Sequence, residues 1–289
     1  MFNGKKIIDA HAHIYPQKIA EAAVRTVKRF YDNIERDYNV TFRSKTGELG
    51  ELLQLAEEAN VVKIVVSSVA TNKSQVVSIN NFLAASAESE SRLIPFATLS
   101  PDMSSEELRL ELARIKTLKL KGVKLHPDFQ QFALDGGQAF KIFEELDGSL
   151  PVLMHTGDSR FNFSSPKQMV KAALKFNHIT FICAHLGGWS EWNDLDGYLK
   201  TPNTFFDTSS AFMFLKPETS LKIIHALGVE RCMFGTDYPM WNYSFESENI
   251  KKIGLTDEEL DKILFENANK FFGQPPKTPG NAGGSPASY

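Results

Sequence analysis

Cysteine, unbalanced charge and long apolar runs are all scarce in this sequence of 289 residues. The two cysteines, Cys183 and Cys232, are too few for a disulfide framework, and both lie in strand-like apolar runs; we expect reduced, buried thiols in a cytoplasmic protein. The net charge is −3 with scattered lysine and arginine, which argues against nucleic-acid or anionic-lipid partners. No apolar run approaches a membrane span, and the first strand begins too early for a signal peptide, so we expect neither.

Short strand-like runs alternate with longer helical patterns along most of the chain. Apolar residues at three- and four-residue spacing predict helices such as Ser105–Leu118 and Pro166–Phe176, and the long first connection, from Tyr15 to about Asn60, is expected to hold an extra helix over Lys18–Arg36. The eight strand-like runs, several rich in β-branched and aromatic residues, are KIIDAHAHI, VVKIVVSSV, LIPFATLSP, LKGVKLHP, PVLMHTG, ITFICAHLGG, TFFDTSS and RCMFGTDYP.

Eight strands, each followed by a helix, is the number that closes a parallel (β/α)8 TIM barrel of the α/β class. An open doubly wound sheet is the rival, but no glycine-rich phosphate loop follows the first strand. Barrels of this length fold as one unit, so we predict a single domain over residues 1–272 with a helical insertion after the first strand. The last helix should span Asp257–Phe272. Gly273–Tyr289 is rich in Pro, Gly and Ser and is expected to be a flexible tail.

The seven histidines are unevenly placed, and five of them end strand-like runs. Histidines two residues apart on one strand project from the same face. In a (β/α)8 barrel the chemistry lies at the C-terminal ends of the strands. A lone histidine there usually serves only as a hydrogen-bonding residue, but several together favour a metal site over a metal-free polar pocket. The strand-end residues are His11, His13, His126, His155, His185 and Asp237, whereas His178 and His225 lie elsewhere.

Five motifs in order, DAHAHIYP, GVKLHP, HTG, AHLGG and FGTDYP, resemble the amidohydrolase superfamily over roughly residues 6–273. Within it they are similar to the amidohydrolase-related branch, which includes aminocarboxymuconate-semialdehyde decarboxylase and related aromatic-acid decarboxylases. The resemblance implies one divalent metal ion per chain, usually Zn2+, although Mn2+ or iron would also suit this donor set. The implied ligands are His11, His13, His155 and Asp237. It further implies that His185 is a catalytic acid, base or polarising group, and that a homodimer is possible.

Such a ligand set predicts an enzyme acting on a small molecule. Three imidazoles and one carboxylate leave zinc a free position for water, whose pKa the ion lowers from ~16 to ~7. Asp237 could take the proton of that water while bound. The leading hypothesis is therefore a metal-dependent hydrolase that cleaves a C–N or C–O bond in a small acidic or cyclic substrate. The alternative is a non-oxidative decarboxylase of an aromatic or unsaturated carboxylic acid. A non-catalytic barrel would have lost at least one ligand position.

Several further residues have roles that the sequence leaves open. Lys124 and His126 should both point into the barrel and are expected to contact substrate. Lys124 could instead form a metal-bridging carbamate, as in some amidohydrolases, or pair with a carboxylate such as Asp9. Arg160 either binds a substrate carboxylate or lies at the surface. Trp241 belongs to a set of loop aromatics that either pack together or line a site for a flat substrate. Asp207 is expected to have a turn or outer-sphere role, since the family does not typically use its strand for metal.

Overall fold

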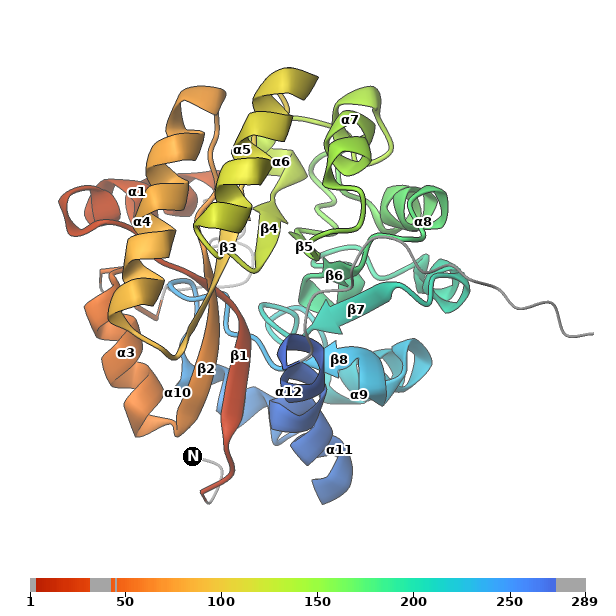
Figure 1. Cartoon of the computed structure of the whole chain (residues 1–289). Helices are drawn as coiled ribbons and strands as arrows, with labels where there is room; N and C mark the ends of the chain where they lie inside the picture. The colour runs from red at the N-terminus through yellow and green to blue at the C-terminus, as the bar shows by residue number, and fades with distance from the viewer. Residues whose placement is uncertain (1–3, 32–42, 45, 274–289) are drawn as a thin grey trace, which may run out of the picture.

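The computed structural model describes residues 4–31, 43–44 and 46–273, and its centre is an eight-stranded parallel sheet in the order β1 to β8 (Figure 1). The sheet closes on itself, because the backbone amides of Ala10 and His13 donate to the carbonyls of Phe234 and Tyr238 just after β8. The fold is therefore the predicted (β/α)8 barrel. Its strands are β1 (Ile7–His13), β2 (Val61–Ser67), β3 (Leu93–Thr98), β4 (Gly122–Leu125), β5 (Val152–Met154), β6 (Phe181–Cys183), β7 (Thr204–Asp207) and β8 (Cys232–Met233).

Helices surround the outside of the barrel (Figure 1). None of those in the described part of the chain is long and apolar enough to cross a membrane. The α-helices are α1 (Gln17–Phe30), α3 (Leu49–Glu58), α4 (Val76–Ser89), α5 (Ser105–Thr117), α6 (Pro127–Gln130), α7 (Gly137–Leu146), α8 (Pro166–Lys175), α9 (Pro217–Leu227), α10 (Tyr243–Ile250), α11 (Asp257–Asp261) and α12 (Asn267–Phe272).

Local capping explains why α5 and α8 begin where the sequence predicts. Ser104 and Ser165 each accept a hydrogen bond from the backbone three residues on, and the Glu or Gln at that position bonds back, which completes a capping box. The first long connection does hold an extra helix, α1, which ends at Phe30; the remainder of the predicted range, up to residue 36, lies outside the described residues, except for Tyr31.

One connection departs from the expected alternation of strand and helix. Between β6 and β7 the described chain forms only 3-10 turns, at His185–Gly187 and Leu195–Lys200. A Cβ on Gly197 would lie 2.9 Å from the Val170 side chain, so the second turn packs directly on α8. The glycine lets the backbone of this stretch approach α8 closely, so turns cover the barrel here. The expectation of a helix after every strand is therefore wrong for the connection after β6.

The final helix closes the N-terminal end of the barrel. The predicted range Asp257–Phe272 is helical throughout, with a π-helical segment, Lys262–Glu266, joining α11 to α12. Ala268 belongs to an apolar cluster with strand residues of the barrel interior, and Phe271 and Phe272 pack against it. One end of the barrel is thus filled with hydrocarbon, which leaves the opposite end for chemistry. Of the predicted tail, residues 274–289 lie outside the described part.

A bulge in β1 decides which of its side chains face inward. Ile8 and Ala10 belong to the interior cluster, so strict alternation would turn the next odd-numbered residues outward. The pairing with β2 shifts between Asp9 and Ala12, where β1 carries one residue more than its partner. His11 thereby reaches the interior, while Asp9 bonds to the backbone amide and hydroxyl of Thr236. The interpretation in which Lys124 pairs with Asp9 is therefore wrong.

Candidate metal centre

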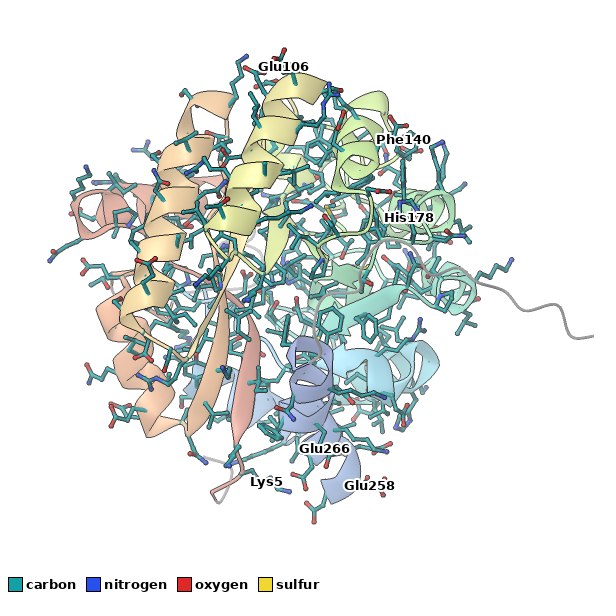
Figure 2. The ribbon with its side chains drawn as sticks, in the orientation of Figure 1. Lys5, Glu106, Phe140, His178, Glu258 and Glu266 are labelled. Carbon is teal, nitrogen blue, oxygen red and sulfur yellow. The ribbon has the colours of Figure 1, made fainter. Side chains whose placement is uncertain are left out.

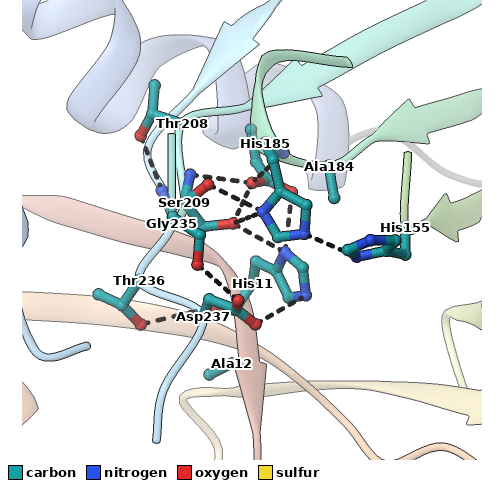
Figure 3. A network of polar contacts seen from close by, with 12 residues as sticks. His11, Ala12, His155, Ala184, His185, Thr208, Ser209, Gly235, Thr236 and Asp237 are labelled. Atoms are coloured by element: carbon teal, nitrogen blue, oxygen red, sulfur yellow. Dashed lines mark hydrogen bonds and ion pairs between the residues drawn. The ribbon is translucent and has the colours of Figure 1, made fainter. Parts of the chain in front are cut away.

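The strand ends bring five histidines into one buried network. These are His11 and His13 of β1, and His126, His155 and His185, which follow β4, β5 and β6. Figure 3 shows His11, His155, His185 and Asp237 within this network. The other two histidines are exposed on the outside of the barrel, where Figure 2 labels His178 at the rim near α8. The rule that places barrel chemistry at the C-terminal strand ends thus separates the two groups.

Three ligand atoms converge at the centre of this network. The Nε2 atoms of His11 and His13 lie 3.1 Å apart. Asp237 Oδ1 lies 3.5 Å from the first and 3.2 Å from the second. Imidazole nitrogen and carboxylate oxygen are the donors that zinc and manganese take in proteins. His11, His13 and Asp237 therefore form a group able to hold a divalent ion.

The outer contacts of both imidazoles turn their lone pairs toward this point. His11 Nδ1 lies 3.0 Å from Asp207 Oδ2, and since a carboxylate only accepts, Nδ1 carries the proton. His13 Nδ1 lies 3.2 Å from the hydroxyl of Ser67, which itself donates to the Ala12 carbonyl. Burial lowers the pKa of both rings, which keeps them neutral. Two bare nitrogens facing each other at 3.1 Å, beside a carboxylate, fit a cation between them.

Asp237 is held by a chain of hydrogen bonds in a strained backbone. The Ser210 hydroxyl donates to Asp237 Oδ2 at 2.6 Å, and the Trp241 indole N–H donates to that hydroxyl at 2.8 Å. Asp237, Ser210 and His185 all have positive φ, which costs free energy for a residue with a Cβ and is typical of functional sites. Trp241, expected to contact substrate, is 1% exposed and holds Ser210 in this arrangement.

Lys124 points at the same centre. It is fully buried, and its Nζ lies 3.0 Å from His11 Nε2. Burial lowers its pKa to about 8, while Asp237 and Asp207 act in the opposite direction. The amine therefore still carries its charge at neutral pH, beside the ligand atoms.

His155 lies one step away from the three converging ligands. Its Nδ1 is 3.0 Å from His185 Nε2, and its ring is stacked on His126 with centroids 3.9 Å apart. His185 Nδ1 lies 2.8 Å from the Ser209 carbonyl and so carries a proton. Burial lowers the pKa of His185 to about 4, so this ring is neutral. The role of His155 as a fourth ligand stays a prediction, because the group around Asp237 does not include it.

The loop arginines have partners away from the converging ligands. Arg160 binds both carboxylate oxygens of Asp158 at 2.9 and 2.7 Å and donates to the Phe30 carbonyl at 2.6 Å. Its guanidinium also lies over four aromatic rings, including that of Trp189 at 5.5 Å. Arg43 lies over the Phe245 ring at 5.3 Å. To bind a substrate carboxylate, Arg160 would have to exchange it for Asp158, so that role stays a prediction.

Sequence reasoning missed several residues that shape the centre. Ser209 and Ser210 follow Asp207 in the quoted run FFDTSS, and Asp128 follows His126 in KLHPDF, so each stood beside a recognised signal. Hydroxyl groups give no periodic pattern, and only the fold shows which acceptor they meet. The aromatic residues Phe30, Tyr31 and Phe129 were also missed, because the end of α1 returns over the strand ends and packs there.

Known proteins resemble this chain along most of its length. A family model described as amidohydrolase matches residues 8–274, which is most of the chain. No curated protein gave a match. Among solved structures, 5-carboxyvanillate decarboxylase LigW from Sphingomonas paucimobilis is similar with a TM-score of 0.70 and 16% identity, covering 93% of this chain and 99% of that one.

Two other solved structures each cover 93% of this chain at 16% identity. A dihydroxybenzoic acid decarboxylase from Polaromonas sp. JS666, with bound manganese and 2-nitroresorcinol, has a TM-score of 0.67 and is covered over 97% of its length. A probable 2-pyrone-4,6-dicarboxylic acid hydrolase from Acinetobacter baumannii has a TM-score of 0.64 and is covered over 99%. These likenesses concern the fold, whereas the family model spans nearly all of the described barrel; the chain belongs to the amidohydrolase family.

Proposed function

We propose that this enzyme is a metal-dependent decarboxylase that removes CO2 from an aromatic or unsaturated carboxylic acid without an oxidant. The sequence favoured a hydrolase and kept decarboxylation as the alternative. Two considerations reverse that order: a buried cationic amine beside the ligand atoms, and the activities named for two of the similar structures. The metal expected from the sequence is zinc, with manganese as the other candidate, and the bound substrate is a small molecule.

The contact of Lys124 with the ligand group carries the proposal. Its Nζ lies 3.0 Å from His11 Nε2, and the side chain is fully buried. A buried ammonium is costly unless an anion compensates it. A carboxylate that binds between a divalent ion and this amine supplies that anion, which a neutral ester or amide does not. The arrangement therefore suits a substrate whose carboxylate enters the centre.

Aromatic side chains beside the centre suit a flat substrate. The Trp189 ring lies 5.8 Å from His155, 5.1 Å from Tyr31 and 5.0 Å from Phe214, measured between centroids. Aromatic rings pack against one another in stacked or edge-on geometries at such distances. An aromatic acid can extend this set of rings while its carboxylate meets Lys124.

Decarboxylation needs a place for electrons and a source of one proton. The bond between the substrate carbon and its carboxylate breaks, the electron pair stays on that carbon, and a proton then replaces CO2. A divalent ion held by His11, His13 and Asp237 would act as a Lewis acid that withdraws charge from the substrate. Lys124 binds the carboxylate and holds a proton at Nζ. His185 is neutral, with Nδ1 committed to the Ser209 carbonyl, so its Nε2 can orient the substrate by accepting a hydrogen bond.

Hydrolysis of a C–N or C–O bond is the second candidate. Its specific support is Asp237, because the Ser210 hydroxyl donates to its Oδ2 at 2.6 Å and so favours the ionised carboxylate. A carboxylate kept ionised in this way can accept a proton from attacking water. A similar fold is found in the probable 2-pyrone-4,6-dicarboxylic acid hydrolase from Acinetobacter baumannii.

Reaction in D2O distinguishes the two. Metal-loaded protein is incubated with a panel of hydroxylated benzoic acids and unsaturated dicarboxylic acids, while released CO2 is measured and the product is examined by mass spectrometry. A decarboxylase gives one CO2 per product and one deuterium on the carbon that lost it. His13→Ala should abolish this reaction and His178→Ala should keep it. If the acids do not react, and a lactone or amide takes up 18O from labelled water, the protein is instead a hydrolase.

A further inference from the structure

Two buried polar atoms near the centre lack partners, and they belong to neighbouring side chains. Among the described residues, His155 Nε2 and Asp128 Oδ1 have no hydrogen-bond partner. The two side chains are neighbours, because His155 Nε2 lies 3.7 Å from Asp128 Oδ2. Both residues are at least 97% buried, at 2% and 3% exposure. Unpaired buried polar atoms are rare and call for a specific reason.

The other nitrogen of His155 explains why the pair is not formed. His155 Nδ1 lies 3.0 Å from His185 Nε2, which is bare because the His185 proton sits on Nδ1 and faces the Ser209 carbonyl. Without an ion, a proton must lie between these two nitrogens, and His155 supplies it from Nδ1. His155 Nε2 then carries no proton. It faces the Asp128 carboxyl group but cannot donate a hydrogen bond to it.

The same residues do not form a second metal site with His126. The rings of His126 and His155 are parallel to within 9°, with centroids 3.9 Å apart. A metal ion lies near the plane of each imidazole that binds it through a nitrogen lone pair. One ion cannot lie near the planes of two rings that are stacked on each other in this way. Although His126, Asp128 and His155 lie close enough to be considered as a ligand group, Asp128 must therefore act on His155 rather than on an ion.

We propose that Asp128 is the positioning residue of the metal centre: its carboxylate accepts the Nε2 proton of His155 and so frees the Nδ1 lone pair for the ion. His155 Nε2, which lies 3.7 Å from Asp128 Oδ2, then gains the acceptor that it lacks. The Ser164 hydroxyl, which donates to Asp128 Oδ2 at 2.6 Å, holds the carboxylate in place. The inference rests on the metal dependence in the proposed function, and it assigns the fourth ligand to a particular nitrogen, Nδ1 of His155.

Metal affinity is the first measurement that tests this role. Dissociation constants for Zn2+ and Mn2+ alone are measured by competition with a chelator, for the wild type, Asp128→Asn and Asp128→Ala. Loss of a carboxylate that orients a ligating histidine typically weakens binding by about 10- to 100-fold. Ser164→Ala keeps the carboxylate and should lose less. Asp135→Asn is the matched control, because Asp135 accepts hydrogen bonds from Lys171 and Gln168 and contacts no histidine in these bonds. The metal affinity of this variant should stay within about twofold of the wild-type value.

The tautomer of His155 is the second measurement. Nitrogen-15 chemical shifts of the ring should place its proton on Nε2 in the zinc-loaded wild type, and on Nδ1 in the metal-free protein. Urea unfolding of each variant shows that a lost affinity does not come from a lost fold. Wild-type affinity in both Asp128 variants, or a zinc-loaded His155 that keeps its proton on Nδ1, would overturn the positioning role alone. A wild type that binds neither ion would overturn the proposed function together with it.

Discussion

Gly157, in the motif HTG after β5, is where the loops carrying His155 and His185 touch. Its φ is +82°, and a Cβ built there would lie 2.0 Å from the carbonyl oxygen of Gly188. The nearest atoms all belong to the backbone of Gly188, so the clash cannot be relieved by rotation of a side chain. Gly157→Ala must therefore strain its own backbone and also push the loop after β5 away from the loop after β6.

The cost of this substitution can be worked from its two components. A left-handed conformation costs a residue with a Cβ about 1–2 kcal/mol. Overpacking of a well-filled interior adds about 1–3 kcal/mol. The free energy of unfolding should therefore fall by roughly 2–5 kcal/mol. Gly254→Ala is the control, because Gly254 has a φ of +90° but its Cβ would meet nothing nearer than Leu221 Cδ2 at 3.9 Å.

Urea unfolding of the two variants beside the wild type measures the difference. Gly254→Ala should show the backbone cost alone, and Gly157→Ala should be less stable than it by about 1–3 kcal/mol. Because His155 and His185 sit on the two loops that are forced apart, Gly157→Ala should also bind Zn2+ more weakly than the control. Equal stability of the two variants would refute the claim that backbone contact between these loops demands a glycine.

Three other outcomes are expected. His11→Ala or His13→Ala should reduce bound metal to background in elemental analysis, whereas His178→Ala should retain it; metal kept by the His11 variant would contradict the ligand set. Wild type purified with bicarbonate and without chelator should hold one ion per chain, and two ions would instead indicate that Lys124 is a bridging carbamate. Neither cysteine should react with a thiol reagent until the protein unfolds, because both are fully buried and burial raises their pKa; prompt labelling would show that a strand opens.

The barrel could be predicted because its elements are encoded by short-range patterns. Alternating strand-like and helical runs, and caps such as Ser104 with Glu107, depend on residues within one turn of each other. Eight strands that alternate with helices are compatible with only a few sheet topologies, and the closed parallel barrel is one of them. The exception, the connection after β6, is covered by turns because Gly197 packs on α8, a contact that no local pattern announces.

The positions of the site residues followed from the fold, but their partners did not. Strand ends predicted that His11, His13 and Asp237 would meet. The bulge in β1, which separates Asp9 from the inward histidines, could not be read from alternation, because a single extra residue reverses the faces that follow. The engagement of Arg160 with its neighbour Asp158 and with the end of α1 was equally hidden.

The sequence by itself determined the barrel, the end of it that carries chemistry, and the residue types gathered there. Only the tertiary structure decided which nitrogen of each histidine faces the centre, since that depends on the acceptor met by the other nitrogen. For His11 that acceptor is Asp207, 196 positions away along the chain. For His155 it is His185 Nε2, 30 positions away, and we propose that Asp128 takes this part when an ion is bound. Local patterns specify elements, but a proton's place on a ring is specified by atoms that only folding brings within hydrogen-bonding distance.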